Sequence, residues 1–173
     1  MRVLDSDRLR LEPQLATHSS EMFALLSDPA LYEFENSTPE SADWLRERFA
    51  KLESRRSPDG SEQWLNWTVR LASSEPIGFV QASVSSDQRA AIAYVFGSAH
   101  WGHGYATEAV VRMIEELDEQ YGVRTLSAIL KRDNLRSLML LNRLEFEVAS
   151  DAVHAELGTD ANEVAMVRSI RVE

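Results

Sequence analysis

The amino-acid sequence predicts one α/β (α+β) domain over residues 1–173, with a mixed, mostly antiparallel sheet of about seven strands flanked by about four helices. Three observations predict this architecture. Segments with strand-like and helix-like patterns follow one another along the whole chain. A chain of 173 residues, 44% of them hydrophobic, suffices for one core. The sequence also contains no repeat, low-complexity tract or linker that would divide it.

The first third of the chain predicts one strand and two helices. Alternating polar and leucine residues predict a strand within residues 4–13. Apolar residues at helical spacing predict a helix over residues 17–27 and another over residues 38–56, which has Pro39 in its first turn. The second helix carries two aromatic residues, Trp44 and Phe49, that we expect in the core, with contact to a substrate as the alternative.

The rest of the chain predicts a meander of three strands followed by further strands and helices. Short polar connections separate the apolar segments of this meander, at residues 64–71, 76–85 and 89–96. A helix is expected over residues 109–121, because its apolar residues recur at helical spacing and Gly122 follows as a terminator. The remaining predicted elements are a strand (125–130), a helix (135–144), a strand (146–150), a loop (151–162) and a final strand (163–172).

The most informative stretch lies at residues 101–109, which read W-G-H-G-Y-A-T-E-A. Its two glycines, Gly102 and Gly104, stand between a predicted strand and the opening of a predicted helix. Glycines let a backbone turn its N–H groups inward, and a helix N-terminus adds unpaired donors and partial positive charge. The stretch therefore predicts an anion site, for which a pyrophosphate group is the natural ligand.

Two stretches of this sequence resemble the GNAT superfamily of acetyltransferases. Residues 101–106 fit its Q/R-x-x-G-x-G/A acyl-CoA motif except at the first position, where Trp101 stands. The longer string W-G-x-G-Y-A-T-E-A is similar to the branch of the ribosomal-protein N-terminal acetyltransferases RimJ and RimL. The string D-R-L-R-L-E-P at residues 7–13 resembles the opening of that branch, with Arg8 and Arg10 on one face of the predicted strand.

The resemblance implies a single GNAT domain that uses acetyl-CoA as its co-substrate. It places the thioester beside the strand that ends at Phe96, and it implies that this strand and the next splay apart to admit the pantetheine arm. A backbone N–H at a bulge in that strand would then stabilise the oxyanion of the tetrahedral intermediate. The residues expected to bind acetyl-CoA are Tyr94, Val95, Phe96, Trp101, Gly102, His103, Gly104, Tyr105, Ala106, Thr107, Asn134 and Ser137.

A second motif begins at residue 134, where a predicted helix starts. The sequence N-L-R-S-L-M-L-L-N-R-L-E-F resembles the family pattern N-x-x-S-x-x-x-L-x-x-x-G-F. The resemblance implies that Asn134 bonds the pantetheine arm, with helix capping as the alternative, and that Ser137 lies near the sulfur as a candidate general acid. Glu145 replaces the family's glycine, so either the helix ends differently or strain is tolerated there. Leu141 stands where many relatives carry a tyrosine proton donor.

The sequence leaves the general base open. Direct attack on the thioester needs a neutral amine, and because an alkyl amine has a pKa of about 8 to 10, a base or a water relay is useful. Many relatives carry a glutamate on the strand before the turn, where this chain has Ala91. Tyr94 could supply a hydroxyl, with core packing as the alternative. The remaining candidates are His18, Glu33, Glu35, His100, His103 and Glu108, the last of which equally complements the helix dipole.

Composition and charge exclude several classes of function. With 28 acidic and 18 basic side chains the net charge is −10, which argues against a nucleic-acid partner. The charge favours a cationic acceptor, or alternatively only keeps the protein in solution. Cys is absent and the four His residues lack metal-binding spacing, so neither a disulfide nor a metal site is expected. No apolar run would span a membrane and the opening residues lack a secretory signal, so we expect a cytoplasmic protein without a membrane partner.

Together these observations predict an acetyl-CoA-dependent N-acetyltransferase, as a monomer or homodimer. The predicted acceptor is a primary amine, such as a protein N-terminus, an amino acid or another small amine. The alternative is a GNAT module that binds acyl-CoA as a sensor or interaction domain without turnover, and the missing strand glutamate and helix tyrosine favour that alternative.

Overall fold

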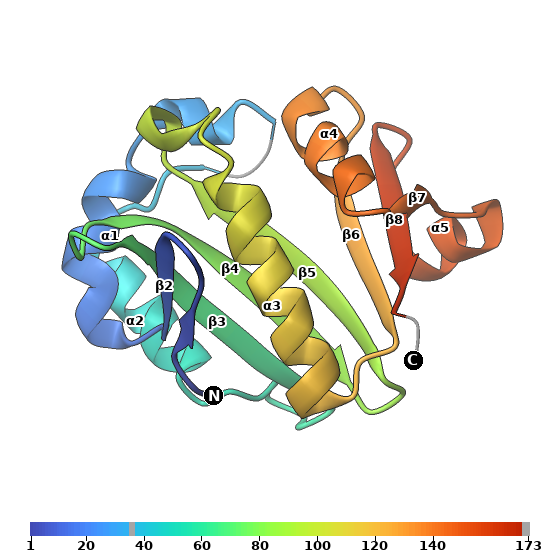
Figure 1. Cartoon of the computed structure of the whole chain (residues 1–173), viewed down its shortest axis with the longest axis horizontal. Helices are drawn as coiled ribbons and strands as arrows, with labels where there is room; N and C mark the ends of the chain where they lie inside the picture. Colours follow the sequence, from blue (N-terminus) through green and yellow to red (C-terminus); the bar gives the residue numbers. More distant parts are fainter. Residues whose placement is uncertain (35–36, 171–173) are drawn as a thin grey trace.

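The computed structural model describes residues 1–34 and 37–170, and in that part of the chain one sheet of eight strands is combined with five α-helices (Figure 1). The strands are β1 (Leu4–Asp5), β2 (Leu9–Pro13), β3 (Glu62–Leu71), β4 (Pro76–Ser85), β5 (Arg89–Phe96), β6 (Thr125–Lys131), β7 (Glu147–Val148) and β8 (Glu163–Ser169). The α-helices are α1 (Ser19–Leu26), α2 (Ala42–Leu52), α3 (Tyr105–Tyr121), α4 (Leu135–Arg143) and α5 (Asp151–Leu157). Three short 3₁₀ helices are η1 (Ala16–His18), η2 (Pro29–Tyr32) and η3 (Ser98–His100).

The strands lie in the order β1-β2-β3-β4-β5-β6-β8-β7. Every neighbouring pair is antiparallel except β5 and β6, which are parallel because α3 carries the chain back between them. The predicted mixed, mostly antiparallel sheet is thus confirmed, with one strand and one helix more than expected. Strands β5 and β6 pair over only three residues; beyond them β5 continues beside β4 and β6 beside β8. This divergence positions the site.

Two cores hold helices on the two faces of the sheet. The larger core lies under α3, which crosses one face in Figure 1, and includes the fully buried Trp67 of β3. The smaller core joins α1 and α2 to the opposite face, where Phe49 packs with Phe79 and Val95. Consecutive strand residues point to opposite faces, so β5 contributes side chains to both layers.

The N-terminal elements differ from the prediction in four respects, one of which is that α2 ends at Leu52 rather than near Arg56. The segment predicted as one strand over residues 4–13 folds back as the β1–β2 hairpin, which supplies the eighth strand. Helix α2 begins after Ser41 rather than around Pro39, because the Ser41 hydroxyl caps it by accepting the Trp44 N–H at 3.0 Å. Trp44 is 39% exposed, so its expected place in the core is wrong, whereas Phe49 is buried as expected.

The C-terminal elements contain one helix that the sequence pattern concealed. The predicted loop over residues 151–162 holds α5, which ends at Gly158 with a left-handed φ of 67°. The polarity of this segment indicated a loop, but Gly158 acts as a helix terminator there. The strand predicted over residues 146–150 is reduced to β7, and the last strand ends at Ser169. Val172, in the predicted strand, lies outside the described residues.

Helix α4 ends in the way that a glycine would end it, although Glu145 occupies the position. Glu145 adopts a left-handed φ of 60°, and the Phe146 N–H donates to the Leu141 carbonyl at 3.0 Å, as in a Schellman motif. A non-glycine residue in this conformation costs about 1 kcal/mol. Of the two alternatives posed by the sequence, tolerated strain is therefore the correct one.

Candidate active site

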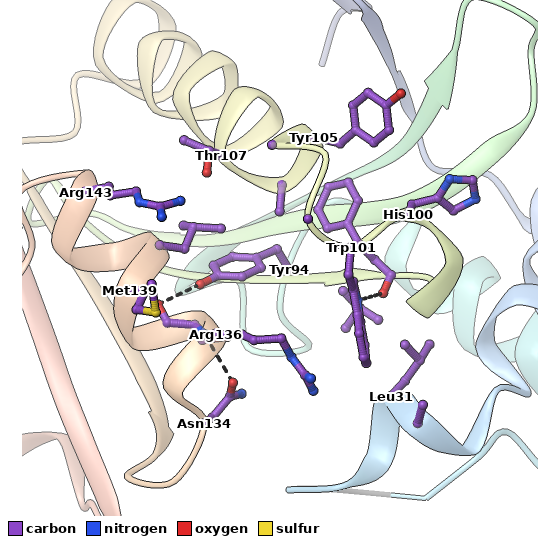
Figure 2. Close-up of a pocket in the computed structure, with 18 of the residues that line it drawn as sticks. Leu31, Tyr94, His100, Trp101, Tyr105, Thr107, Asn134, Arg136, Met139 and Arg143 are labelled. Atoms are coloured by element: carbon purple, nitrogen blue, oxygen red, sulfur yellow. Dashed lines mark hydrogen bonds between the residues drawn. The ribbon is translucent and has the colours of Figure 1, made fainter.

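One cavity gathers nearly all of the residues predicted to bind acetyl-CoA. It has a volume of about 400 Å³ and lies between the start of α3, helix α4 and the end of β5 (Figure 2). Of the predicted residues only His103 is absent from its wall. The predicted residues that line it are Tyr94, Val95, Phe96, Trp101, Gly102, Gly104, Tyr105, Ala106, Thr107, Asn134 and Ser137.

The glycine turn presents main-chain groups to this cavity. Gly102 and Gly104 have φ values of 78° and 80°, a left-handed conformation that glycine adopts without strain. Helix α3 begins directly after Gly104, and its first internal hydrogen bond runs from the Glu108 N–H to the Gly104 carbonyl. The N–H groups of the three residues before Glu108 therefore have no acceptor within the helix. These donors and the helix dipole suit an anionic ligand.

The predicted gap between two strands is present beneath the turn. Strands β5 and β6 pair from Arg89 to Ala91 and then diverge, so the last residues of β5 have no partner on that side. The predicted bulge in β5 is absent, since β5 keeps an unbroken register with β4. The register shift in this part of the sheet lies in β3, between Val69 and Arg70.

A backbone donor faces the gap even without a bulge. The Trp101 indole N–H donates to the Phe96 carbonyl at 2.7 Å, on the side away from β4, whereas the next residue, Gly97, donates its N–H toward β4. In an antiparallel strand the N–H and C=O groups of one residue point the same way. The Phe96 N–H therefore points into the gap as well.

Tyr94 and helix α4 close the other side of the cavity. The Tyr94 hydroxyl donates to the Ser137 carbonyl at 3.5 Å, and burial raises the pKa of Tyr94 to about 12, so its hydroxyl remains protonated near neutrality. The Asn134 side-chain carbonyl caps α4 by accepting the Ser137 N–H at 3.2 Å. The amide NH₂ of Asn134 is the part of that side chain left for a ligand.

Comparison with known families identifies this architecture. Residues 8–147 match the family model of the acetyltransferase (GNAT) domain. The chain belongs to the GNAT acetyltransferases. It is 26% identical over 149 residues to an uncharacterised N-acetyltransferase of Bacillus licheniformis, an alignment that covers 85% of this chain and 83% of that protein.

Solved structures of the GNAT fold resemble the chain over nearly its whole length. RimL, a ribosomal-protein alpha-N-acetyltransferase in complex with coenzyme A, has a TM-score of 0.80 at 15% identity, covering 97% of this chain and 98% of that one. An aminoglycoside acetyltransferase in complex with coenzyme A has a TM-score of 0.74 at 18% identity, covering 93% and 94%. At these identities the likeness confirms the predicted fold.

In this GNAT domain, sequence reasoning missed the wall opposite the glycine turn and two arginines of α4. Arg136 lies over the Trp101 ring at 3.8 Å and pairs with Glu33 of the segment after η2 at 3.2 Å. Arg143 also lines the cavity, and its side chain makes no hydrogen bond or ion pair with any residue that the structure describes. Arg136 and Arg143 are two helical turns apart, so they lie on one face of α4, and this spacing could have predicted them from the sequence. The unforeseen lining residues are Ala30, Leu31, Phe34, Arg136, Met139, Leu140 and Arg143.

Besides Tyr94, His100 is the described candidate for a general base that lines the GNAT cavity. Its Nε2 atom lies 3.5 Å from the Glu75 carboxylate, and Figure 2 shows its ring turned away from Tyr94. Glu33 is occupied by its ion pair with Arg136. His100 is therefore poorly placed to take a proton from a group beside Tyr94.

The other candidate bases that the structure describes lie away from the cavity. The Glu108 carboxylate is bound by Arg8; burial alone would raise its pKa, but hydrogen bonds and the arginine charge outweigh burial and hold the pKa below its usual value. His103 is exposed on the turn, and His18 hydrogen-bonds to Thr68 of β3 at 3.2 Å and does not line the cavity. Glu35 lies outside the described residues.

Two classes of site find no support in the described part of this GNAT chain. No group of three or more histidine, cysteine or carboxylate side chains is arranged to hold a metal ion among residues 1–34 and 37–170. Within the same ranges, no helix combines the length and apolarity needed to span a membrane.

Proposed function

We propose that this GNAT protein transfers an acetyl group from acetyl-CoA to a primary amine. The observation that carries the proposal is one cavity that joins a helix N-terminus with free N–H groups to a gap between two strands. A pyrophosphate suits the first part, and an extended pantetheine arm suits the second. The coenzyme A found in RimL and in the aminoglycoside acetyltransferase supports the same ligand here.

The proposed binding mode assigns a role to each part of the wall. The N–H groups at the start of α3 bind the pyrophosphate, for which the space around Gly102 is open. Arg143, whose charge has no partner among the described residues, adds attraction for the phosphates. The amide NH₂ of Asn134 donates to a carbonyl of the pantetheine arm.

The proposed chemistry is direct attack of the amine nitrogen on the thioester carbon. The new C–N bond forms as the carbonyl oxygen gains negative charge, which the Phe96 N–H stabilises. The C–S bond then breaks, and the departing sulfur takes a proton from Tyr94, or from Ser137 as the sequence suggested; the donor then regains a proton from water. The nitrogen loses its extra proton to water. Tyr94 on β5 thus replaces the tyrosine that α4 lacks.

The amine acceptor is expected to arrive neutral, because His100 faces Glu75 rather than the space beside Tyr94. At pH 7 an α-amino group with a pKa near 8 is neutral in about a tenth of molecules, against fewer than about one in a thousand for a lysine side chain. Peptide N-termini and other weakly basic amines therefore suit the site best. The kcat/KM should rise with pH along the titration of the acceptor amine.

The second candidate function is that of a GNAT module, which would bind acyl-CoA without turnover. Ala91 and Leu141, which stand where relatives carry a glutamate and a tyrosine, favour it. Two measurements separate the functions. Calorimetry with acetyl-CoA should show binding at micromolar concentrations, and no binding would contradict both. Incubation with acetyl-CoA and a panel of peptides and small amines should release free thiol; binding without release across the panel would favour the module.

A further inference from the structure

We infer that Arg8, just before β2, is a positioning residue that holds the glycine turn in the shape that binds phosphate. This inference rests on the proposed function, because it takes the phosphates of acetyl-CoA as the ligand of the turn. It gives a role to the D-R-L-R-L segment, which the proposed chemistry leaves unused.

Arg8 joins two points of the turn that are separate in the chain. Its backbone N–H and its Nε atom donate to the two carboxylate oxygens of Glu108, at 2.8 and 2.7 Å. Its Nη1 atom donates to the carbonyl of His103 at 3.0 Å. One guanidinium therefore fixes the middle of the turn against the first turn of α3.

The neighbours of Arg8 complete this arrangement. The Ser6 hydroxyl donates to Glu108 at 2.8 Å, so the carboxylate is held from two sides. The guanidinium lies 4.7 Å from the centre of the Tyr105 ring, in a cation–π contact with the residue that opens α3. Its Nη2 atom would be 3.5 Å from a Cβ at Gly104, so the arginine lies directly behind the glycine.

Arg8 acts on the turn from outside, not on the ligand. It does not line the cavity of the candidate active site; it lines a separate groove beside β2 and β3. A turn with two left-handed glycines has many alternative conformations, and only one aims its N–H groups at a common point. Trp101 also replaces the basic or amide residue of the acyl-CoA motif, so phosphate binding at the turn depends on these main-chain donors.

Arg10, which lies in β2 two residues after Arg8, provides a matched control. Its side chain is 51% exposed, against 49% for Arg8, and it is also in an ion pair, with Asp5 at 3.0 Å. Its hydrogen bonds run to Asp5 and Glu12, and no contact with the glycine turn is found in the described part of the chain. Loss of either arginine removes one surface charge, but only loss of Arg8 should loosen the turn.

The test compares acetyl-CoA with S-acetylpantetheine, which lacks all phosphates. Arg8→Gln should weaken acetyl-CoA binding about tenfold and leave S-acetylpantetheine binding unchanged. The variant loosens only the main-chain N–H groups that bind phosphate, and S-acetylpantetheine has no phosphate to bind there. Arg10→Gln should change neither affinity by more than about twofold. Equal losses for both ligands in Arg8→Gln, or an unchanged acetyl-CoA affinity, would overturn the inference. Thermal unfolding monitored by circular dichroism checks that each variant is folded.

Whether Glu108→Gln tightens or weakens acetyl-CoA binding gives an independent test. If this carboxylate acted only through its charge, Glu108→Gln would tighten acetyl-CoA binding by removing repulsion of the phosphates. If it holds Arg8 against the turn, the same variant should weaken binding severalfold. A tighter complex would sink the inference about positioning while leaving the proposed function intact. Absence of acetyl-CoA binding by the unmodified protein would instead contradict the proposed function itself.

Discussion

The two ends of the cavity are built from different kinds of groups. The end at α3 is formed by main-chain N–H groups and left-handed glycines. The end at η2 is formed by the side chains of Leu31 and Phe34, with Arg136 bridging to Glu33. Main-chain geometry is set largely by residues that are neighbours in the sequence, so the end at α3 can be recognised as a sequence motif. The second end meets the cavity through tertiary contacts, so no local motif marks it, and we expect the acceptor to contact this end.

The strongest test of this comparison is a substitution at the main-chain end. Gly104→Glu should weaken acetyl-CoA binding by at least about a hundredfold, because the φ of 80° strains a side chain and the carboxylate repels the phosphates. Calorimetry measures the loss. Gly158→Glu is the control, since Gly158 has a φ of 67°, open space around it and a place outside the cavity. Equal loss of affinity in the two variants would show that strain alone is responsible.

A second test removes the proton donor between the two ends. Tyr94→Phe should lower kcat about 10- to 100-fold while the acetyl-CoA dissociation constant changes little, because the ring stays and only the hydroxyl is lost. Single-turnover thiol release with a saturating amine is the measurement. If Ser137→Ala shows the larger fall in kcat and Tyr94→Phe none, the proton comes from Ser137 instead.

The difference between the main-chain end and the side-chain end of the cavity also explains which features the sequence could predict. Gly102 and Gly104 need a particular backbone, so the turn and its cavity followed from local pattern, as did the capping alternative for Asn134. The roles of Arg8 and Arg136 depend on contacts with partners about 100 positions away in the chain. No local spacing encodes such contacts. Helix α5 was missed for another reason: none of its residues is buried, so it lacks the apolar stripe on which helix prediction depends.

A third test compares the two arginines of α4, one at each end of the cavity. Arg143→Gln should weaken acetyl-CoA binding about 5- to 10-fold, and the difference from the unmodified protein should shrink at high salt, as expected for an attraction between charges. Arg136→Gln should have an effect of roughly twofold, because Glu33 already neutralises that charge. Calorimetry at two salt concentrations distinguishes them. A larger loss for Arg136→Gln would place the phosphates at the η2 end and reverse the comparison.

The smallest effect is expected at the side-chain end. Phe34→Ala should raise the KM of the best acceptor about 3- to 10-fold and leave the acetyl-CoA dissociation constant unchanged, because it removes apolar contact from the wall away from the glycine turn. Phe23→Ala is the matched control: Phe23 packs in the core of α1 and α2 without lining the cavity, so its loss should lower thermal stability and spare the KM. If Phe34→Ala weakened acetyl-CoA binding as much as acceptor binding, the two ligands would share that wall. The main-chain and side-chain ends would then not be separate sites for the two substrates.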